Sequence, residues 1–179
     1  GSSPAAGSSP QAGKEGGNLI VAAFADATTM DPHQATSDDL NLRSTSLFEG
    51  LATQDEKLVY GPQLAESWTS SPDGVEWTFK LRKGVTFHDG TPFNAAAVKA
   101  NYDRVADPKN ALAVRSSLVY LKEVQVVDEF TVKLVHTQPD AAVLANAAAI
   151  TMLSPTAFQA KSKEEFGRAP VATGPFKFK

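Results

Sequence analysis

The most constraining feature of the sequence is a strict alternation of apolar and polar residues from Val75 to Arg82. A period of two is that of a β-strand, whose successive side chains point to opposite faces of its sheet. The tripeptide Pro72-Asp73-Gly74 directly before it is typical of a tight turn, because proline presets φ and glycine accepts a positive φ. We therefore predict a strand with one apolar face, entered through a turn. We expect Trp68 in the preceding strand to pack against that face.

Similar patterns predict elements on both sides of this strand. A hairpin is expected around 55–57, and a second one around Asp128-Glu129, where apolar and polar residues alternate on either side. Asn94 is expected to cap a helix over 95–106, in which apolar residues recur at helical spacing. Three further helices are expected: one over 38–48 that is stopped by Gly50, one that is capped by Asp140 and runs to 149, and one that starts at Pro155. Strands are expected over 18–25, 151–153 and 176–179. Turns are expected at Gly84 and Gly90, and a short helix or loop over 111–120.

Composition narrows the class of protein. The formal net charge of the 179 residues is −3, which gives no basic surface of the kind that binds nucleic acid. No apolar run approaches the roughly 18 residues of a membrane-spanning helix. The absence of cysteine removes disulfides, thiolate metal sites and cysteine nucleophiles, and it is compatible with either side of a membrane. We expect a soluble globular protein with enough length for a core.

The sequence contains no recognisable catalytic or metal-binding constellation. His33, His88 and His136 lie far apart, without a helical i, i+4 pair or a carboxylate at a metal-ligand spacing. There is no Gly-x-Ser-x-Gly nucleophile motif and no phosphate-binding glycine loop. Carboxylates are present, but sequence alone does not place two of them at one site. We therefore predict no catalytic residue, no metal site and no cofactor.

The central strand and its flanks match a known family. The runs Leu-Ala-Glu-Ser-Trp at 64–68 and Trp-Thr-Phe-Lys-Leu-Arg-Lys-Gly-Val-Thr-Phe-His-Asp-Gly-Thr-Pro-Phe at 77–93 closely resemble the peptide/nickel class, family 5, of extracellular solute-binding proteins. These are the oligopeptide-type receptors of ABC importers. Phe-Glu-Gly-Leu at 48–51 and Pro-Val-Ala-Thr-Gly-Pro-Phe at 170–176 resemble further family segments, with Ala172 in place of the usual first glycine.

The resemblance implies a mixed α/β (α+β) fold of the periplasmic-binding-protein type II, of which this chain supplies part of the first of two lobes. It divides the chain into a flexible tether (1–17), the N-terminal strand and helix of that lobe (18–48), a subdomain (49–168) and a returning strand (169–179). Because the sequence stops within a strand pattern, we expect an N-terminal fragment. The tether lacks large apolar residues, so it cannot offset its ordering entropy. It resembles a lipoprotein spacer; a cloning remnant is the alternative.

The resemblance also implies a function and candidate contacts. Thr36, Asp38 and Thr45 match positions where relatives touch their ligand, and so do Val114 and Arg115. Asp38 would meet a ligand amine and Arg115 a carboxylate in charge-assisted pairs. The alternatives are a simple helix cap for Asp38 and a solvated surface charge for Arg115.

Receptors of this class close two lobes around a solute and present it to a membrane ABC permease. We therefore expect capture of a solute, a short peptide first, by a monomer in the periplasm or on the extracellular face of the membrane, held there only by a lipid anchor. The alternatives are binding of nickel complexes or oligosaccharides and a structural fragment without a ligand. A hydrolase would need a residue cluster that we do not find.

Overall fold

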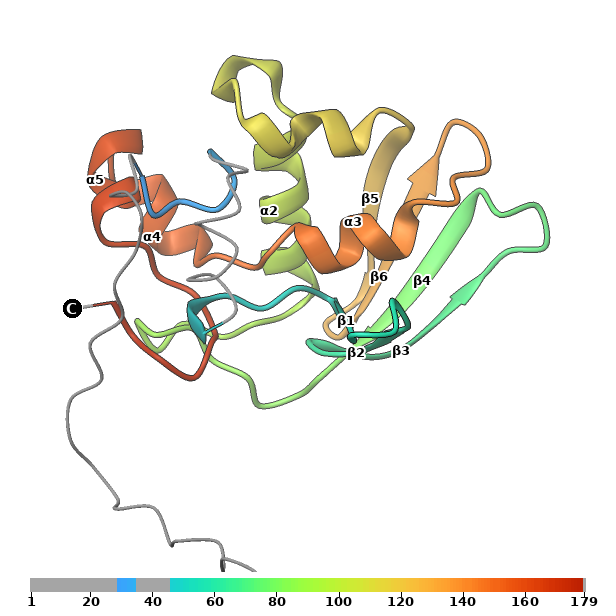
Figure 1. The fold of residues 1–179 in the computed structure, drawn as a ribbon, viewed down its shortest axis with the longest axis horizontal. Helices are drawn as coiled ribbons and strands as arrows, with labels where there is room; N and C mark the ends of the chain where they lie inside the picture. Colours follow the sequence, from blue (N-terminus) through green and yellow to red (C-terminus); the bar gives the residue numbers. More distant parts are fainter. Residues whose placement is uncertain (1–28, 35–45, 179) are drawn as a thin grey trace, which may run out of the picture.

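The computed structural model describes residues 29–34 and 46–178. The tether over 1–17, the expected strand over 18–25 and the part of the expected helix before residue 46 lie outside these residues. At the end of that helix Ser46 and Leu47 are helical as predicted, and Phe48 is not. The described elements are β1 (Ala52–Gln54), β2 (Tyr60–Pro62), β3 (Ala65–Ser70), β4 (Glu76–Leu81), α2 (Ala95–Ala106), the 3₁₀ helices η1 (Pro108–Asn110) and η2 (Ala113–Leu118), β5 (Leu121–Asp128), β6 (Thr131–His136), α3 (Val143–Ala149), α4 (Pro155–Ala160) and α5 (Lys163–Arg168). Figure 1 shows the larger sheet at one end, α4 and α5 at the other, and α2 between them.

The larger sheet is antiparallel, with strand order β3-β4-β6-β5, and it is built around the predicted alternating strand. Phe79 and Leu81 are buried on its inner face, while the alternate Lys80 is exposed. The ring of Trp68 lies 6.1 Å from that of Phe79, which confirms the predicted contact. The preceding turn is confirmed as well, because Gly74 adopts a φ of +69° that a side chain would disfavour.

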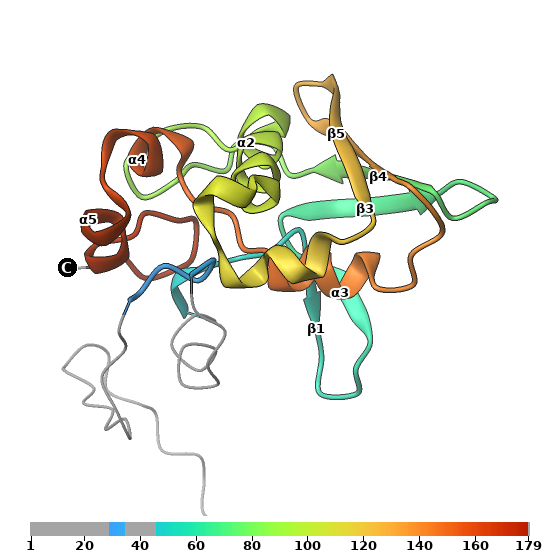
Figure 2. The same cartoon turned by 90° about the horizontal axis from the view of Figure 1, so that it is seen from above.

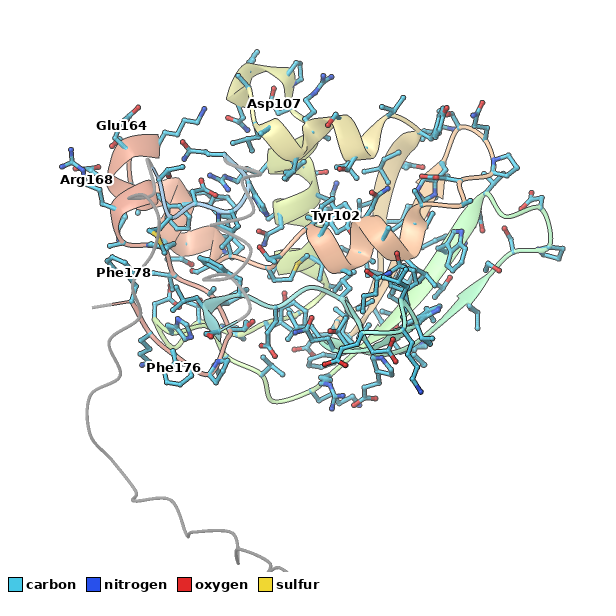
Figure 3. All side chains as sticks on the ribbon, in the orientation of Figure 1. Tyr102, Asp107, Glu164, Arg168, Phe176 and Phe178 are labelled. Carbon is cyan, nitrogen blue, oxygen red and sulfur yellow. The ribbon has the colours of Figure 1, made fainter. Side chains whose placement is uncertain are left out.

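Helix α2 covers the sheet and begins and ends where the sequence predicts. The Asn94 side chain accepts a hydrogen bond from the Ala97 N–H at 3.0 Å, so it caps the helix as expected. Val98, Tyr102 and Val105 are buried in the core that the helix shares with β4 and β6. Figure 3 places Tyr102 inside the molecule, whereas Phe176 and Phe178 lie at its periphery along the C-terminal segment.

Two predicted helix signals act differently in the structure. Helix α3 begins at Val143, and Asp140 precedes it: its carboxylate accepts from the Ala142 N–H at 2.8 Å and closes a turn rather than capping the helix. The role predicted for Gly50 is also wrong. A Cβ at this position would lie 2.7 Å from the carbonyl oxygens of Ala147 and Ala148, so glycine is required by the close approach of the chain to α3.

The strands predicted over 151–153 and 176–179 are not formed in the described part of the chain. Between 151 and 154 the backbone groups bond to four different places, namely His33, Glu49, Asn101 and Val171, and only Leu153 makes an isolated bridge, to Ala172. The N–H groups of Gly174 and Phe176 donate to the carbonyls of Leu47 and Ser46, which are helical residues and not a strand. A strand needs a continuous partner, and these scattered partners do not provide one.

Candidate functional site

Three segments that are far apart in the sequence are joined by backbone hydrogen bonds. We call this region the joint; its segments are 46–50, 150–154 and 170–174. The Met152 N–H donates to the Glu49 carbonyl at 2.7 Å, and the Ser154 N–H donates to that of Val171 at 2.9 Å. The Gly174 N–H donates to the Leu47 carbonyl at 3.1 Å. These bonds hold the chain where it enters the body of the structure and where it leaves it.

The turn at 88–90, which follows β4, is hydrogen-bonded to this joint from one side. The His88 N–H donates to the Ala172 carbonyl at 2.8 Å, and its Nε2–H donates to the Gly174 carbonyl at 2.6 Å. The hydroxyl of Ser154 donates to the Asp89 carboxylate at 2.5 Å. The motif His-Asp-Gly therefore has a structural task in this chain, and its histidine and carboxylate are occupied.

A second buried cluster ties the N-terminal segment to α2. Asp31 and His33 are fully buried, and Arg104 of α2 reaches both of them. Its Nη2 lies 2.5 Å from Asp31 Oδ2, and its Nη1 lies 2.8 Å from His33 Nδ1. The guanidinium also faces the rings of Phe158 and Phe166, at 4.9 and 5.4 Å. We call Asp31, His33 and Arg104 the Arg104 cluster.

The electrostatics of the cluster fix the proton on His33. Burial, followed by the charge of Arg104, lowers the pKa of His33 to about 4, so the ring is neutral at pH 7. Arginine only donates, so Nδ1 accepts and the ring proton sits on Nε2. That Nε2–H donates to the Thr151 carbonyl at 2.9 Å. Burial opposes ionisation of Asp31, but the hydrogen bond and charge of Arg104 outweigh it and lower the pKa of this carboxyl.

A hollow of about 420 Å³ opens beside the joint, between the β1–β2 hairpin and α3. Figure 2 shows this hairpin projecting from the body next to α3. We call it the hairpin hollow; its lining is Phe48, Gly50, Ala52, Thr53, Gln54, Tyr60, Gln63, Ala145, Ala148, Ala149 and Thr151. No lining residue carries a charge. Gln63 Oε1 accepts from the Gly50 N–H at 3.0 Å, while Thr151 Oγ1 is buried and has no hydrogen-bond partner among the described residues.

The structure places only two of the five sequence-predicted contacts, because Thr36, Asp38 and Thr45 lie outside the described residues. Val114 is buried in η2, and its N–H donates to the His33 carbonyl at 3.5 Å, next to the Arg104 cluster. Arg115 is exposed, and its Nε donates to the Ala106 carbonyl at the end of α2.

Sequence reasoning missed the Arg104 cluster and Thr151, since nothing local marks them. Within 29–34 and 46–178 the structure holds no group of three or more metal-ligating side chains. Nor does any helix there have the length and apolarity to cross a membrane.

The described part of the chain combines a mixed α/β fold with a hollow whose uncharged lining offers hydrogen bonds, features that suit a protein that binds a small solute. Comparison with known proteins identifies the family: residues 59–179 match the bacterial extracellular solute-binding proteins, family 5 (middle). The chain belongs to this family, whose members are binding proteins and not enzymes.

Individual relatives agree with this assignment. The glutathione-binding protein GsiB of Escherichia coli O6:K15:H31 is 41% identical over 162 residues, which cover 89% of this chain and 31% of the relative. NikZ from Campylobacter jejuni, solved with Ni(L-His), superimposes with a TM-score of 0.78 at 28% identity, over 87% of this chain and 31% of its own. DppA from Helicobacter pylori, solved with the peptide STSA, superimposes with a TM-score of 0.76 at 29% identity. The match covers 87% of this chain and 35% of DppA.

The chain thus spans about a third of the length of these relatives. Its predicted fold class is confirmed as part of one lobe of a type II periplasmic binding protein.

Proposed function

We propose that this chain is the N-terminal portion of a receptor that captures a short peptide and delivers it to an ABC permease. The observation that carries the proposal is the uncharged hairpin hollow in a member of family 5, together with the Thr151 hydroxyl, which has no partner among the described residues. Neutral hydrogen-bonding groups suit the amides and side chains of a peptide. Two relatives point the same way, because one is described as binding glutathione, which is a tripeptide, and another was solved with STSA.

The proposal extends to the surroundings of the site. Thr36, Asp38, Thr45, Val114 and Arg115 remain our proposed ligand contacts. We propose that the receptor acts as a monomer in the periplasm or at the extracellular face of the membrane, where a lipid anchor holds it. The family's description as extracellular supports this location.

We further propose that residues 49–168 form a subdomain within the lobe. Support comes from the joint, where the entering chain at Leu47 and the leaving chain at Gly174 are hydrogen-bonded to each other. The chain would enter and leave a self-contained subdomain at two neighbouring points of this kind.

The test is calorimetric titration of the complete natural polypeptide that contains residues 1–179. The ligands are glutathione, the tetrapeptide Ser-Thr-Ser-Ala, the nickel–histidine complex and cellobiose. We expect saturable binding of at least one peptide at micromolar concentration. Saturation by the nickel complex or the sugar alone, or by none of the four, would overturn the peptide proposal.

A further inference from the structure

The size of the hairpin hollow matches a part of a solute better than a whole one. Its volume of about 420 Å³ lies near the lower end of the roughly 300–1,000 Å³ that small-molecule pockets occupy. Alanines of α3 form one wall, so short side chains leave the space open, and the β1–β2 hairpin forms the opposite wall. A single side chain fits this space.

The lining selects for an uncharged occupant. It contains hydroxyl and amide groups but no lysine, arginine, histidine, aspartate or glutamate. A charged group moved from water into such a space would lose hydration without gaining a partner of opposite charge. A neutral polar or aliphatic group loses much less.

Thr151 supplies a hydrogen-bonding group that the protein itself leaves unused. Its Oγ1 is buried without a partner in the described part of the chain, and the residue lines the hollow. Its backbone is fixed, because the carbonyl accepts from His33 Nε2 and His33 is in turn held by Arg104. A buried hydroxyl without a partner is unfavourable for folding, so a hydrogen-bonding group that a solute brought to Thr151 would stabilise the complex.

We propose that the hairpin hollow is a subsite for one uncharged side chain of the bound peptide, with Thr151 Oγ1 as its hydrogen-bonding group. This subsite rests on the proposed peptide-binding function. It adds a specificity: at one position of the peptide, neutral side chains are accepted and charged ones are rejected.

The experiment uses the complete natural polypeptide and a series of tripeptides. Trialanine is changed at each position in turn to Leu, Gln, Glu or Lys, and dissociation constants are measured by calorimetry. At one position, we expect the Leu and Gln peptides to bind at least roughly tenfold more tightly than the Glu and Lys peptides. Equal binding of all four at every position would overturn the subsite.

Two variants locate this preference in the hollow. Ala149→Leu places a larger side chain in the hollow at the last residue of α3. We expect this variant to weaken binding of the preferred Leu and Gln peptides roughly tenfold, while binding of trialanine is nearly unaffected. Ala160→Leu is the matched control, because Ala160 is also an exposed alanine at the last position of a short helix and lies outside the hollow. A loss shared by both variants, or a loss that is equal for every peptide, would overturn the assignment.

Thr151→Val tests the hydroxyl and does not depend on the larger substitution being tolerated. This variant should weaken binding of the Gln peptide roughly threefold to tenfold and leave binding of the Leu peptide unchanged. The melting temperature should not fall, because the hydroxyl has no partner among the described residues. An unchanged ratio of Gln to Leu binding refutes the role of Thr151. If no tripeptide binds the wild-type protein at all, the peptide function fails together with the subsite.

Discussion

Replacing Asn101 by alanine should remove the hydrogen-bond partners that the described part of the chain offers to the backbone of Leu153. Asn101 is fully buried in the middle of α2. Its Nδ2 donates to the Leu153 carbonyl at 2.8 Å, and its Oδ1 accepts from the Leu153 N–H at 3.0 Å. One side chain amide thus takes the place of a neighbouring strand for Leu153. In Asn101→Ala both backbone groups of Leu153 stay buried and lose their partner.

The size of the effect follows from these two groups. An unpaired buried backbone group costs about 1–3 kcal/mol, so the pair costs roughly 2–6 kcal/mol. Alanine is a better helix former than asparagine, which offsets up to about 0.7 kcal/mol of this cost. The expected loss in the free energy of unfolding is therefore roughly 1.5–5 kcal/mol, a large part of the 5–15 kcal/mol typical of a native protein.

Urea denaturation followed by circular dichroism at the helix band measures this loss. Asn146→Ala is the matched control, because Asn146 also lies inside a helix, α3, and its side chain makes no hydrogen bond to a described residue. We expect the control to be neutral or slightly stabilising. If Asn101→Ala lost less than about 1 kcal/mol, or no more than the control, the assumption that its amide satisfies Leu153 would be refuted.

Three further outcomes are expected. Asn94→Ala should lower the free energy of unfolding by about 0.5–2 kcal/mol, and an unchanged urea midpoint would contradict its role as a cap. Gly174→Ala should destabilise by about 1–3 kcal/mol, because a Cβ there would overlap the Leu47 carbonyl. Gly61→Ala, with only one side-chain atom at 3.8 Å, should have a smaller effect in the same assay. His33 has a pKa of about 4 in the folded state, below its ordinary 6.5, because burial and a neighbouring guanidinium oppose its charge. The stability it contributes is therefore complete above about pH 6.5 and is lost by up to about 1.4 kcal/mol per pH unit as the pH falls towards 4; His33→Gln should flatten the stability curve in this window.

Local signals in the sequence predicted the elements that depend on local chemistry. The alternation in β4 and the Asn94 cap of α2 act within a few residues, and both predictions are confirmed. The helix α5 also carries such a signal, a capping box of Ser162 and Glu165, which sequence reasoning did not use. The strand predicted over 151–153 failed for a different reason. Its apolar residues suit a strand, but their backbone partners are fixed by tertiary contacts.

The candidate site was harder to predict because its contacts join distant parts of the chain. Asn101 and Leu153 are 52 positions apart, and Arg104 and His33 are 71 positions apart. No periodicity connects such pairs, and each residue type alone is compatible with a solvated surface. Thr151 is similar, since a threonine after an apolar run gives no hint that its hydroxyl is buried beside a hollow.

The choice of arginine at position 104 indicates that the cluster serves geometry more than stability. A buried ion pair is often no more stabilising than apolar residues of the same volume, because both charges lose their hydration. A lysine would supply the charge but not the fork that reaches Asp31 and His33 at once. Nor would it offer a planar face to the ring of Phe158. The guanidinium therefore holds two parts of the structure in place. It fixes the course of the N-terminal segment, and through the His33 ring it fixes the position of the Thr151 carbonyl at the hairpin hollow. The proposed binding surface is thus positioned by a side chain that does not line it.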